Sequence, residues 1–342
     1  MEWKLEEFQF ELEEDLIAKY PARNREDSRL LTLNREKGEM KIEDRFSKIF
    51  DYLREGDILV FNNTKVSKRR VYLLTKSGRI HESVLLEERE GSWYTLIRNS
   101  SKLRNGDILY DTSGKIEFHF SRRSDGRIYL KPSKSLTEEI FETIGSIPIP
   151  PYLKRKADPS DEVRYQTVYA KVPGSVAAPT AGLHFTDSLK NSLLEKGIKI
   201  LEITLRVGYG TFAPLQEFQI QNKKLHKEDY HISEECAEIL NEFKGKSRII
   251  SVGSTTLRAL ESAFDKEKKK FTPGNHSTDI FLYPGDNIES IDGLITNFHL
   301  PGSSILLLVA AFASKELVMK AYNLAIQNKM RFYSYGDSML II

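Results

Sequence analysis

Residues 174–185 read GSVAAPTAGLHF and lie near the middle of a chain of 342 residues. Most of these residues are small, and the one side chain among them that titrates near neutral pH is His184. Thr186 then suits a helix N-cap, the leucines that follow have helical spacing, and Gly197 suits the helix end. Small residues let a ligand approach the backbone, and N–H groups at a helix start attract anions. The stretch therefore predicts one wall of a ligand site.

The composition is that of a globular protein long enough for two domains, with 40% hydrophobic and 29% charged residues. A single cysteine, Cys236, excludes an internal disulfide, disfavours a thiolate metal cluster and suits a reducing compartment. The first ten residues lack an apolar signal core, and the longest apolar run, Ile305–Ala313, is too short to span a bilayer. We expect a cytoplasmic protein without a membrane segment.

Strand and helix signals alternate outside the region of residues 69–147, which is typical of an α/β domain. Ile58–Phe61 and Arg248–Gly253 predict buried strands, and the second runs into a helix capped by Ser254–Thr256. Leu294–His299 repeats this arrangement, because a strand leads to a Pro-Gly turn and Ser303 then caps a nearly all-apolar helix. A helix that is apolar all round is buried.

A different pattern fills the region between about residues 71 and 134. Short alternating segments are separated by turn dipeptides at 77–78, 90–91, 105–106, 113–114 and 125–126, which predicts an inserted all-β module. A capping box at Ser135–Glu138 opens a helix that ends at Gly145, and the stiff segment Ile147–Tyr152 marks the return. We predict a large α/β domain of residues 1–68 and 148–342, and a small β domain of residues 69–147.

Basic charge is concentrated although the net charge is only +2. Residues 61–164 hold 20 Lys and Arg against 14 Asp and Glu. The cations that stand out are Lys65, Lys68, Arg69, Arg70 and, in an earlier loop, Arg29. They form either solvated edges or a surface that contacts phosphates. The β module, with nine cations against four anions over residues 98–134, is either a further RNA-binding surface or merely a soluble module.

Two further patterns point to a ligand. Tyr165 and Tyr169 are four residues apart, which suits either the core stripe of a helix or a stacking surface for a heterocycle. Residues 200–207 alternate as a strand whose second face carries Glu202, Thr204 and Arg206. The glycines of Gly208–Phe212 follow directly and favour a polar cavity at the strand end.

The densest ionisable cluster is Leu225–His231. On a strand, His226 and Glu228 share one face and His231 takes the other. Two histidines and a carboxylate suggest a metal, but no HExxH spacing is present, and we expect none. The other interpretation is acid–base chemistry or substrate contact by His226 and Glu228.

Later residues add polar groups in apolar surroundings. Arg258 lies in the first turn of a predicted helix, where the helix dipole disfavours a cation that lacks an anionic partner. A strand delivers Asn297 and His299 to a turn. Residues 331–339 are aromatic and hold Tyr333 and a carboxylate with buried surroundings, Asp337, which is unusual for a terminal segment.

Taken in order, these stretches resemble the S-adenosylmethionine:tRNA ribosyltransferase-isomerases of queuosine biosynthesis. The matching segments are 16–18 (LIA), 28–31 (SRLL), 61–66 (FNNTKV), 164–170 (RYQTVYA), 174–185, 207–212 (VGYGTF), 295–301 (ITNFHLP) and 331–339. The family usually has His where this chain has Arg206, and Pro where it has Glu13. No catalytic role is therefore carried over to position 206.

The resemblance implies a large α/β barrel-like domain that carries a small inserted β-barrel. It also implies that S-adenosylmethionine is a co-substrate that donates its ribosyl group and not its methyl group. The acceptor is the aminomethyl arm of 7-aminomethyl-7-deazaguanine (preQ1) at the wobble position of tRNA. Adenine and methionine leave, and the product is epoxyqueuosine. The implied partner is tRNA, and we expect a monomer.

That chemistry needs a base for the C5′ proton beside the sulfonium and an acid for adenine, for which the candidates, with pKa values near working pH, are His184, His226 and His299. Candidates for stacking on adenine or facing the sulfonium are Tyr165, Tyr169, Phe185 and Tyr333. Glu228 or Asp337 would hold the base's tautomer or the substrate's amine, and Arg258 the methionine carboxylate. Thr255 and Asn297 are also expected at the co-substrate.

Two other classes of function stay open. A metal-dependent hydrolase would use His226, Glu228 and His231. A non-catalytic tRNA-binding module would rely on residues 65–70 and the β module.

Overall fold

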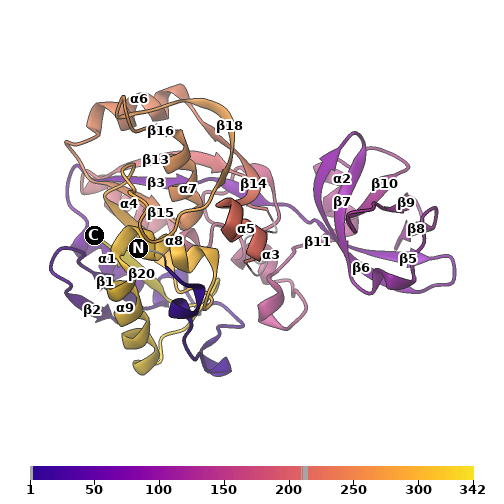
Figure 1. The fold of residues 1–342 in the computed structure, drawn as a ribbon, viewed down its shortest axis with the longest axis horizontal. Coiled ribbons are helices and arrows are strands. Elements are labelled where there is room, and N and C mark those ends of the chain that lie inside the picture. Colours follow the sequence, from indigo (N-terminus) through magenta and orange to yellow (C-terminus); the bar gives the residue numbers. More distant parts are fainter. Residues whose placement is uncertain (1–2, 209, 211–214) are drawn as a thin grey trace.

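The computed structural model describes residues 3–208, 210 and 215–342. Figure 1 shows a large body that contains both chain ends and a smaller β body joined to it by extended segments. Tyr209 and Thr211–Phe212 of the glycine-rich stretch lie outside the described residues. No helix in the described part of the chain is long and apolar enough to cross a membrane.

The large body is built on a nine-stranded mixed sheet. In spatial order its strands are β18 (Gly274–Ile280), β14 (Lys224–Ile232), β13 (Lys199–Leu205), β3 (Ile58–Asn62), β15 (Ile249–Val252), β19 (Gly293–Asn297), β20 (Ser338–Ile341), β1 (Leu30–Leu33) and β2 (Met40–Glu43). Strands β13, β3, β15 and β19 are parallel to one another. Every residue of β3, β15 and β19 is buried. This matches the unbroken apolar runs, since parallel strands are covered on both faces.

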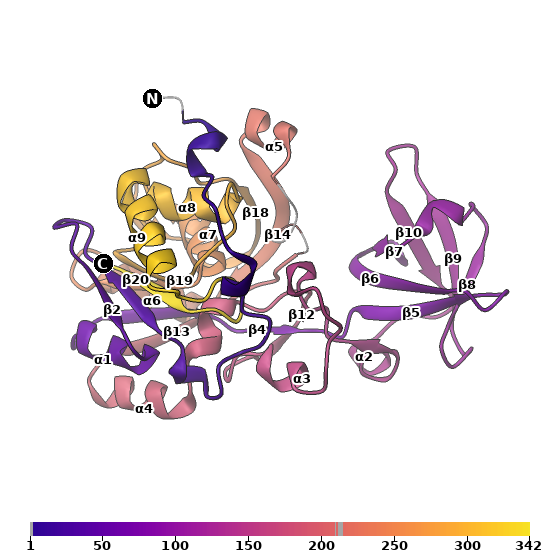
Figure 2. The same cartoon turned by 90° about the horizontal axis from the view of Figure 1, so that it is seen from below.

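Helices cover both faces of this sheet (Figure 2). On one face α1 (Ile49–Tyr52) and α4 (Asp187–Glu195) pack with Leu59 and Phe61. On the other face Ile58 and Val60 pack with a second group, namely α6 (Glu234–Phe243), α7 (Ser254–Ala263), α8 (Ser304–Ala313) and α9 (Lys315–Gln327). Alternate residues of one strand thus serve two cores. The expected α/β class is confirmed.

The caps of these helices agree with the sequence in two of three cases. Thr186 accepts a hydrogen bond from the N–H of Leu189 at 3.1 Å and starts α4. Ser303 does the same for Leu306 at 3.2 Å and starts α8, which is buried along most of its length. Before α7 the N-cap is Gly253 instead of a Ser or Thr, with φ of 99° and no side-chain cap. A positive φ of this kind favours glycine.

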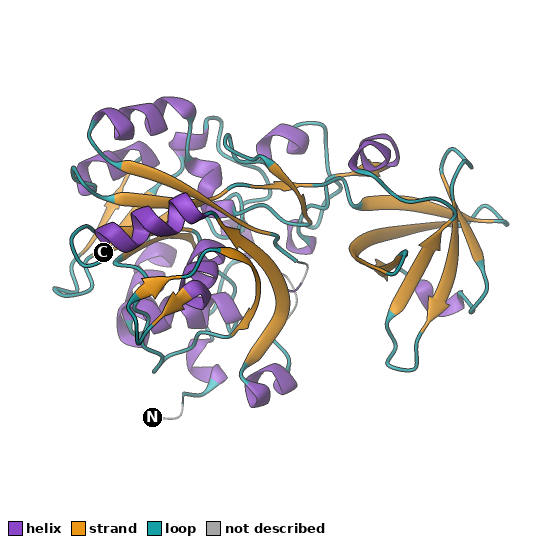
Figure 3. Cartoon of the chain, turned by 90° about the horizontal axis from the view of Figure 1, so that it is seen from above, coloured by secondary structure: helices purple, strands orange, loops and turns teal. Residues whose placement is uncertain are grey.

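The small body is a closed six-stranded barrel, which confirms the inserted β-barrel (Figure 3). Around the barrel its strands are β5 (Arg70–Thr75), β6 (Ile80–Arg89), β7 (Ser92–Ile97), β10 (Ile128–Pro132), β9 (Glu117–Arg122) and β8 (Ile108–Asp111), and β8 pairs with β5. The glycines of the five predicted turn dipeptides all have positive φ, between 71° and 92°. Helix α2 (Glu138–Ile144) and β11 (Gly145–Ser146) lead back to the large body. We propose the division into residues 1–68 with 148–342 and residues 69–147.

The remaining elements correct two local predictions. Helix α3 (Asp161–Arg164) ends before Tyr165, so Tyr165 and Tyr169 do not share a helix. The N-cap of α2 is Thr137, because its side chain and not that of Ser135 accepts from the helix N–H groups. The terminal segment, whose composition is unusual for a chain end, leads into the buried interior strand β20. The other short elements are β4 (Thr64–Val66), β12 (Val172–Ser175), α5 (Glu217–Asn222), β16 (Phe264–Asp265) and β17 (Lys270–Phe271).

Candidate functional site

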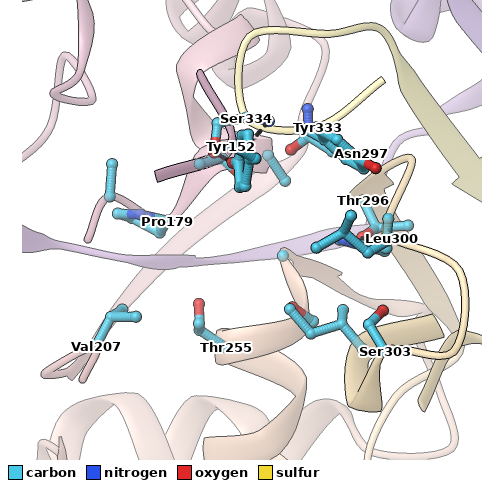
Figure 4. Close-up of a pocket in the computed structure, with 17 residues that line it drawn as sticks. Tyr152, Pro179, Val207, Thr255, Thr296, Asn297, Leu300, Ser303, Tyr333 and Ser334 are labelled. Atoms are coloured by element: carbon cyan, nitrogen blue, oxygen red, sulfur yellow. Dashed lines mark hydrogen bonds between the residues drawn. The ribbon is translucent and has the colours of Figure 1, made fainter. Parts of the chain in front are cut away.

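The main cavity lies where parallel strands end. Its walls come from residues at or just after the ends of β13, β15 and β19, which are Val207, Gly253–Thr255, Thr296, Asn297, His299 and Leu300, together with part of the 174–185 stretch. Open α/β sheets place ligands at this edge, outside the carboxyl ends of the strands. The cavity holds about 650 Å³ of space that is partly open to solvent. Figure 4 shows Tyr152, Tyr333 and Ser334 on the side opposite Thr255 and Ser303.

A side cavity adjoins the main cavity. It is lined by His226, Glu228 and Arg258 together with apolar side chains such as Leu225 and Leu282. Three residues line both cavities, Ser254, Thr255 and Ile305. One elongated ligand can therefore reach both cavities. The predicted site residues that line them are Thr255, Asn297, His299 and Tyr333 in the main cavity and Thr255, His226, Glu228 and Arg258 in the side cavity.

Glu228 and Arg258 form a buried ion pair at the side cavity, with side chains 4% and 9% exposed. Arg258 Nη1 donates to Glu228 Oε2, and the N–H of Gly208 donates to Oε1 at 2.8 Å. Within the described residues, Nε and Nη2 of Arg258 are buried and have no hydrogen-bond partner. Leaving a buried charged donor unpaired costs free energy. These two N–H groups are therefore available to an anionic ligand.

His184 lies beside the main cavity but does not line it. Asn297 Nδ2 donates to His184 Nε2 at 3.0 Å, so the ring proton is on Nδ1 and is donated to Ser28 Oγ at 2.6 Å. Burial, reinforced by the charges of Arg331 and Arg25, lowers the pKa of His184 to about 3. The prediction of a pKa near neutrality is wrong for this residue, because the ring is enclosed and both nitrogens are bonded.

Asn297 is positioned by this contact. Its Nδ2 points to His184, and its buried Oδ1 has no partner among the described residues. Since Asn297 lines the main cavity, Oδ1 is an acceptor for a ligand N–H there.

His299 lies at the main cavity and is held at two atoms. Its Nε2 is 2.7 Å from Thr296 Oγ1, and its backbone N–H donates to Tyr322 Oη at 2.9 Å. Burial lowers the pKa of His299 to about 3, which also contradicts the prediction of a pKa near neutrality. The ring is therefore neutral at working pH. His226, in contrast, is exposed at the side cavity.

Asp337 is buried as expected, at 2% exposure, but lines neither cavity. Its Oδ1 accepts from the backbone N–H of Arg29 at 2.8 Å, and its Oδ2 from that of Arg331 at 2.8 Å. The side chain of Arg29 is itself occupied, because it donates to the carbonyl of Asn328 at 2.9 Å and to that of Lys329. The structure therefore gives Asp337 and Arg29 a role in joining β1 to the 331–337 segment, instead of substrate or RNA contact.

Three of the four proposed stacking aromatics are core residues. Tyr165 contacts the ring of Tyr335, and Tyr169 and Phe185 pack edge-to-face on Phe61. None of the three lines either cavity. The fourth, Tyr333, does line the main cavity, where its ring centroid is 4.7 Å from that of Tyr152. Burial raises the pKa of Tyr333 to about 12.

Sequence reasoning missed Tyr152 and Ser334 as site residues. Both line the main cavity, and Tyr152 Oη hydrogen-bonds Ser334 Oγ. Tyr152 ends the proline-rich return segment 147–152, and that position next to a rigid crossing was the signal available.

The run of cations at 65–70 is not one exposed surface, contrary to the RNA-binding interpretation. Lys68 pairs with Glu162 at 2.9 Å and Glu142 at 3.2 Å. Arg69 lies over the rings of Trp93 and Phe141 and pairs with Glu138 at 2.9 Å, all within the barrel body. Arg70 donates to the carbonyl of Ile149 at 2.8 Å. Lys68 and Arg70 therefore bond across the junction of the barrel and the large body, and Lys65 alone of the four cations is exposed.

The polar face of β13 lines a different hollow, here named the strand groove. Thr204, Arg206, Asp229 and His231 line this groove, which is open to solvent and holds about 1030 Å³ of space. His226 and Glu228 line the side cavity instead, so the predicted separation of His231 from them is confirmed. No group of three metal-ligating side chains occurs within the residues that the structure describes.

Comparisons with known proteins agree over the whole chain. The family described as "Queuosine biosynthesis protein" matches residues 5–341. A protein named S-adenosylmethionine:tRNA ribosyltransferase-isomerase from Halothermothrix orenii is 45% identical over 99% of this chain and 100% of its own length. Its namesake from Staphylococcus aureus is 43% identical over 99% of both chains. The crystal structure of S-adenosylmethionine tRNA ribosyltransferase from Thermotoga maritima is 32% identical, covers 98% of this chain and 100% of its own, and has a TM-score of 0.55.

Proposed function

Because this chain belongs to the queuosine biosynthesis family of S-adenosylmethionine:tRNA ribosyltransferase-isomerases, which are enzymes, we propose the following specific reaction. The ribosyl group of S-adenosylmethionine moves to the aminomethyl arm of preQ1 at the tRNA wobble position. Adenine and methionine leave, and epoxyqueuosine is formed. The proposal includes action as a monomer in the cytoplasm.

The observation that carries this proposal is the pair of joined cavities at the carboxyl ends of the strands. S-adenosylmethionine is elongated, with a nucleoside at one end and an amino acid at the other. The main cavity offers aromatic and amide groups, and the side cavity offers a buried ion pair. Ser254 and Thr255, at the junction of the two, would lie near the sulfonium.

The amino-acid end would bind in the side cavity. The two unpartnered N–H groups of Arg258 match a carboxylate, which accepts such a fork of donors in a bidentate manner. Glu228 keeps the guanidinium in place and would attract the ammonium group of methionine. Each charge of the ligand would thus meet an opposite charge of the protein.

The adenosine end would bind in the main cavity. The Asn297 Oδ1 acceptor suits the amino group of adenine, and Tyr333 with Tyr152 offers an aromatic surface. His184 would act as a positioning residue, because its ring fixes the direction of the Asn297 amide. Tyr165, Tyr169, Phe185 and Asp337 are not part of this proposal.

The chemistry needs proton transfer at two atoms. The C5′ proton beside the sulfonium is acidic, and a neutral imidazole would accept it; His299 in the main cavity is neutral because of its burial. Adenine leaves more readily when it gains a proton as the N9–C1′ bond breaks, and the exposed His226 is the candidate donor. Cleavage of the C5′–S bond returns its electron pair to sulfur and releases methionine, and the preQ1 amine forms the new bond to the ribosyl carbon and loses a proton.

The test is adenine release from S-adenosylmethionine in the presence of tRNA that carries preQ1. We expect the single substitutions His226→Ala and His299→Ala to lower kcat by about 10²- to 10⁴-fold. His184→Ala should act mainly on the KM for S-adenosylmethionine. The matched control is His231→Ala, since His231 lines only the strand groove. Near-normal turnover in both the His226 and the His299 variants would remove the histidine mechanism, and absence of adenine release by the unaltered protein would refute the function.

A further inference from the structure

Apart from the side cavity, a further hollow lies beside the main cavity and is here named the arginine crevice. It is lined by Arg25, Arg164 and Arg331 together with Ser28, His184 and Ser334. Ser334 lines both the crevice and the main cavity. The hydrogen bond between His184 and Asn297 also joins a wall of one to a wall of the other. A group bound in the crevice would therefore be a close neighbour of one bound in the main cavity.

Two of the guanidinium groups are held by neutral acceptors. Arg25 donates to the carbonyls of Val163, Gln166 and Leu183 at 2.9, 2.8 and 3.1 Å. Arg164 donates to the carbonyls of Ala22 and Arg23 at 2.7 and 3.0 Å. These bonds fix the position of each charge. They do not neutralise it, because a carbonyl oxygen carries no formal charge.

Carboxylates neutralise little of this charge. Among the described residues, the ion pair of the crevice is that of Arg331 with Asp337, at 3.5 Å. Asp337 is shared, because Arg29 lies 3.4 Å from its other oxygen. Burial and the charge of Arg164 lower the pKa of Arg25, whereas Asp187 raises it by a smaller amount. The crevice therefore carries an excess of positive charge in partly desolvated surroundings, where such charge attracts an anion strongly.

We propose that the arginine crevice binds a phosphate group of the RNA backbone, next to the nucleotide whose base enters the main cavity. This inference rests on the proposed function, since it takes tRNA to be the substrate. A phosphodiester is an anion with two free oxygens, and guanidinium groups bind such oxygens through paired N–H donors. A base in the main cavity necessarily brings its own backbone to the cavity mouth. The contact would hold the RNA without reading its sequence.

Arg331 is the residue to alter, because its side chain is 33% exposed and Asp337 keeps its two backbone N–H partners without it. The probe is a stem-loop RNA of the anticodon arm that carries preQ1. We expect Arg331→Gln to weaken binding about 10- to 100-fold, the range of one lost charge-assisted hydrogen bond. The slope of log affinity against log salt should become shallower by roughly 0.7 to 0.9. Arg331→Lys keeps the positive charge, so it should retain part of the RNA affinity and part of the salt dependence.

The matched control is Arg54→Gln, which removes the same charge from the loop before β3, at the opposite ends of the parallel strands. It should leave the affinity and the salt slope unchanged. A second measurement replaces one loop phosphate at a time by an uncharged methylphosphonate. At one position the replacement should weaken binding to the unaltered protein and have no further effect on Arg331→Gln.

Unchanged RNA affinity and salt slope in Arg331→Gln would overturn the inference. So would a raised KM for S-adenosylmethionine with unchanged RNA binding, because the crevice would then hold the methionine carboxylate. These binding measurements do not depend on turnover. Failure of adenine release in the unaltered protein would therefore count against the proposed function and not against the phosphate contact.

Discussion

Replacement of Arg258 by glutamine separates its contribution to folding from its contribution to ligand binding. Its partner Glu228 is 4% exposed, so Arg258→Gln leaves a buried carboxylate with the Gly208 N–H as its remaining strong contact. Breaking a buried pair from one side costs roughly 3–5 kcal/mol of unfolding free energy. The same change removes the two N–H groups that would bind methionine, each charge-assisted bond contributing roughly 1.5–3 kcal/mol. We therefore expect the KM for S-adenosylmethionine to rise at least tenfold.

The double variant Glu228→Gln/Arg258→Gln distinguishes the two effects. It removes both charges together, so most of the lost stability should return, as happens when buried pairs are replaced as units. Binding of S-adenosylmethionine should not return. Urea unfolding measures the first quantity, and calorimetric titration with S-adenosylmethionine measures the second. If affinity recovers together with stability in the double variant, Arg258 supports the fold and does not bind the carboxylate.

Three further predictions concern the histidines, the 174–185 stretch and the domain junction. His184 and His299 have a pKa of about 3 when folded and about 6.5 when unfolded, so as pH falls the unfolded state binds protons first and stability is lost. Between pH 7 and 5.5 the urea-derived free energy of unfolding should fall by roughly 2.5 kcal/mol, and by about half of that in His299→Gln; a flat profile would contradict the burial. Gly182→Ala places a Cβ 1.8 Å from Tyr169 Oη and should destabilise by about 1–3 kcal/mol in thermal unfolding, with partial relief when Tyr169→Phe is added. Arg69→Ala removes the cation over the rings of Trp93 and Phe141 and should speed amide exchange in α2, and unchanged exchange would refute its role in holding α2 to the barrel.

The features that local sequence could predict are those with a local cause. The five turn glycines of the barrel all adopt positive φ, because the tight turns between short strands require it. Asn297 and His299 reach the main cavity because Asn297 is the last residue of β19 and His299 follows two residues later. For the same reason Thr255 and Arg258 follow β15 into the two cavities.

The predictions that failed concern residues whose partners lie far along the chain. Arg69 follows other cations in sequence, yet its partners are two rings of the barrel and Glu138. Tyr169 and Phe185 lie in sequence segments that are typical of a ligand site, but both rings pack on Phe61 in the core between the sheet and the helices. Burial also sets the pKa of a histidine, and the spacing of residues in the sequence does not reveal that His184 is enclosed. The sequence does not indicate Tyr152 as a site residue, because its hydrogen-bond partner Ser334 lies near the other end of the chain.

Strand β20 lies between β19 and β1, so residues 338–341 separate β1 from the rest of the large sheet. During synthesis, the pair of β1 and β2 therefore cannot join the rest of the large sheet until those residues have left the ribosome. The barrel, in contrast, is built from one continuous piece of chain between β5 and β11 and can close much earlier. A nascent chain would thus carry a finished barrel on an unfinished large body. The main cavity, which borders β19 and the 331–337 segment, would form only in the last step of folding.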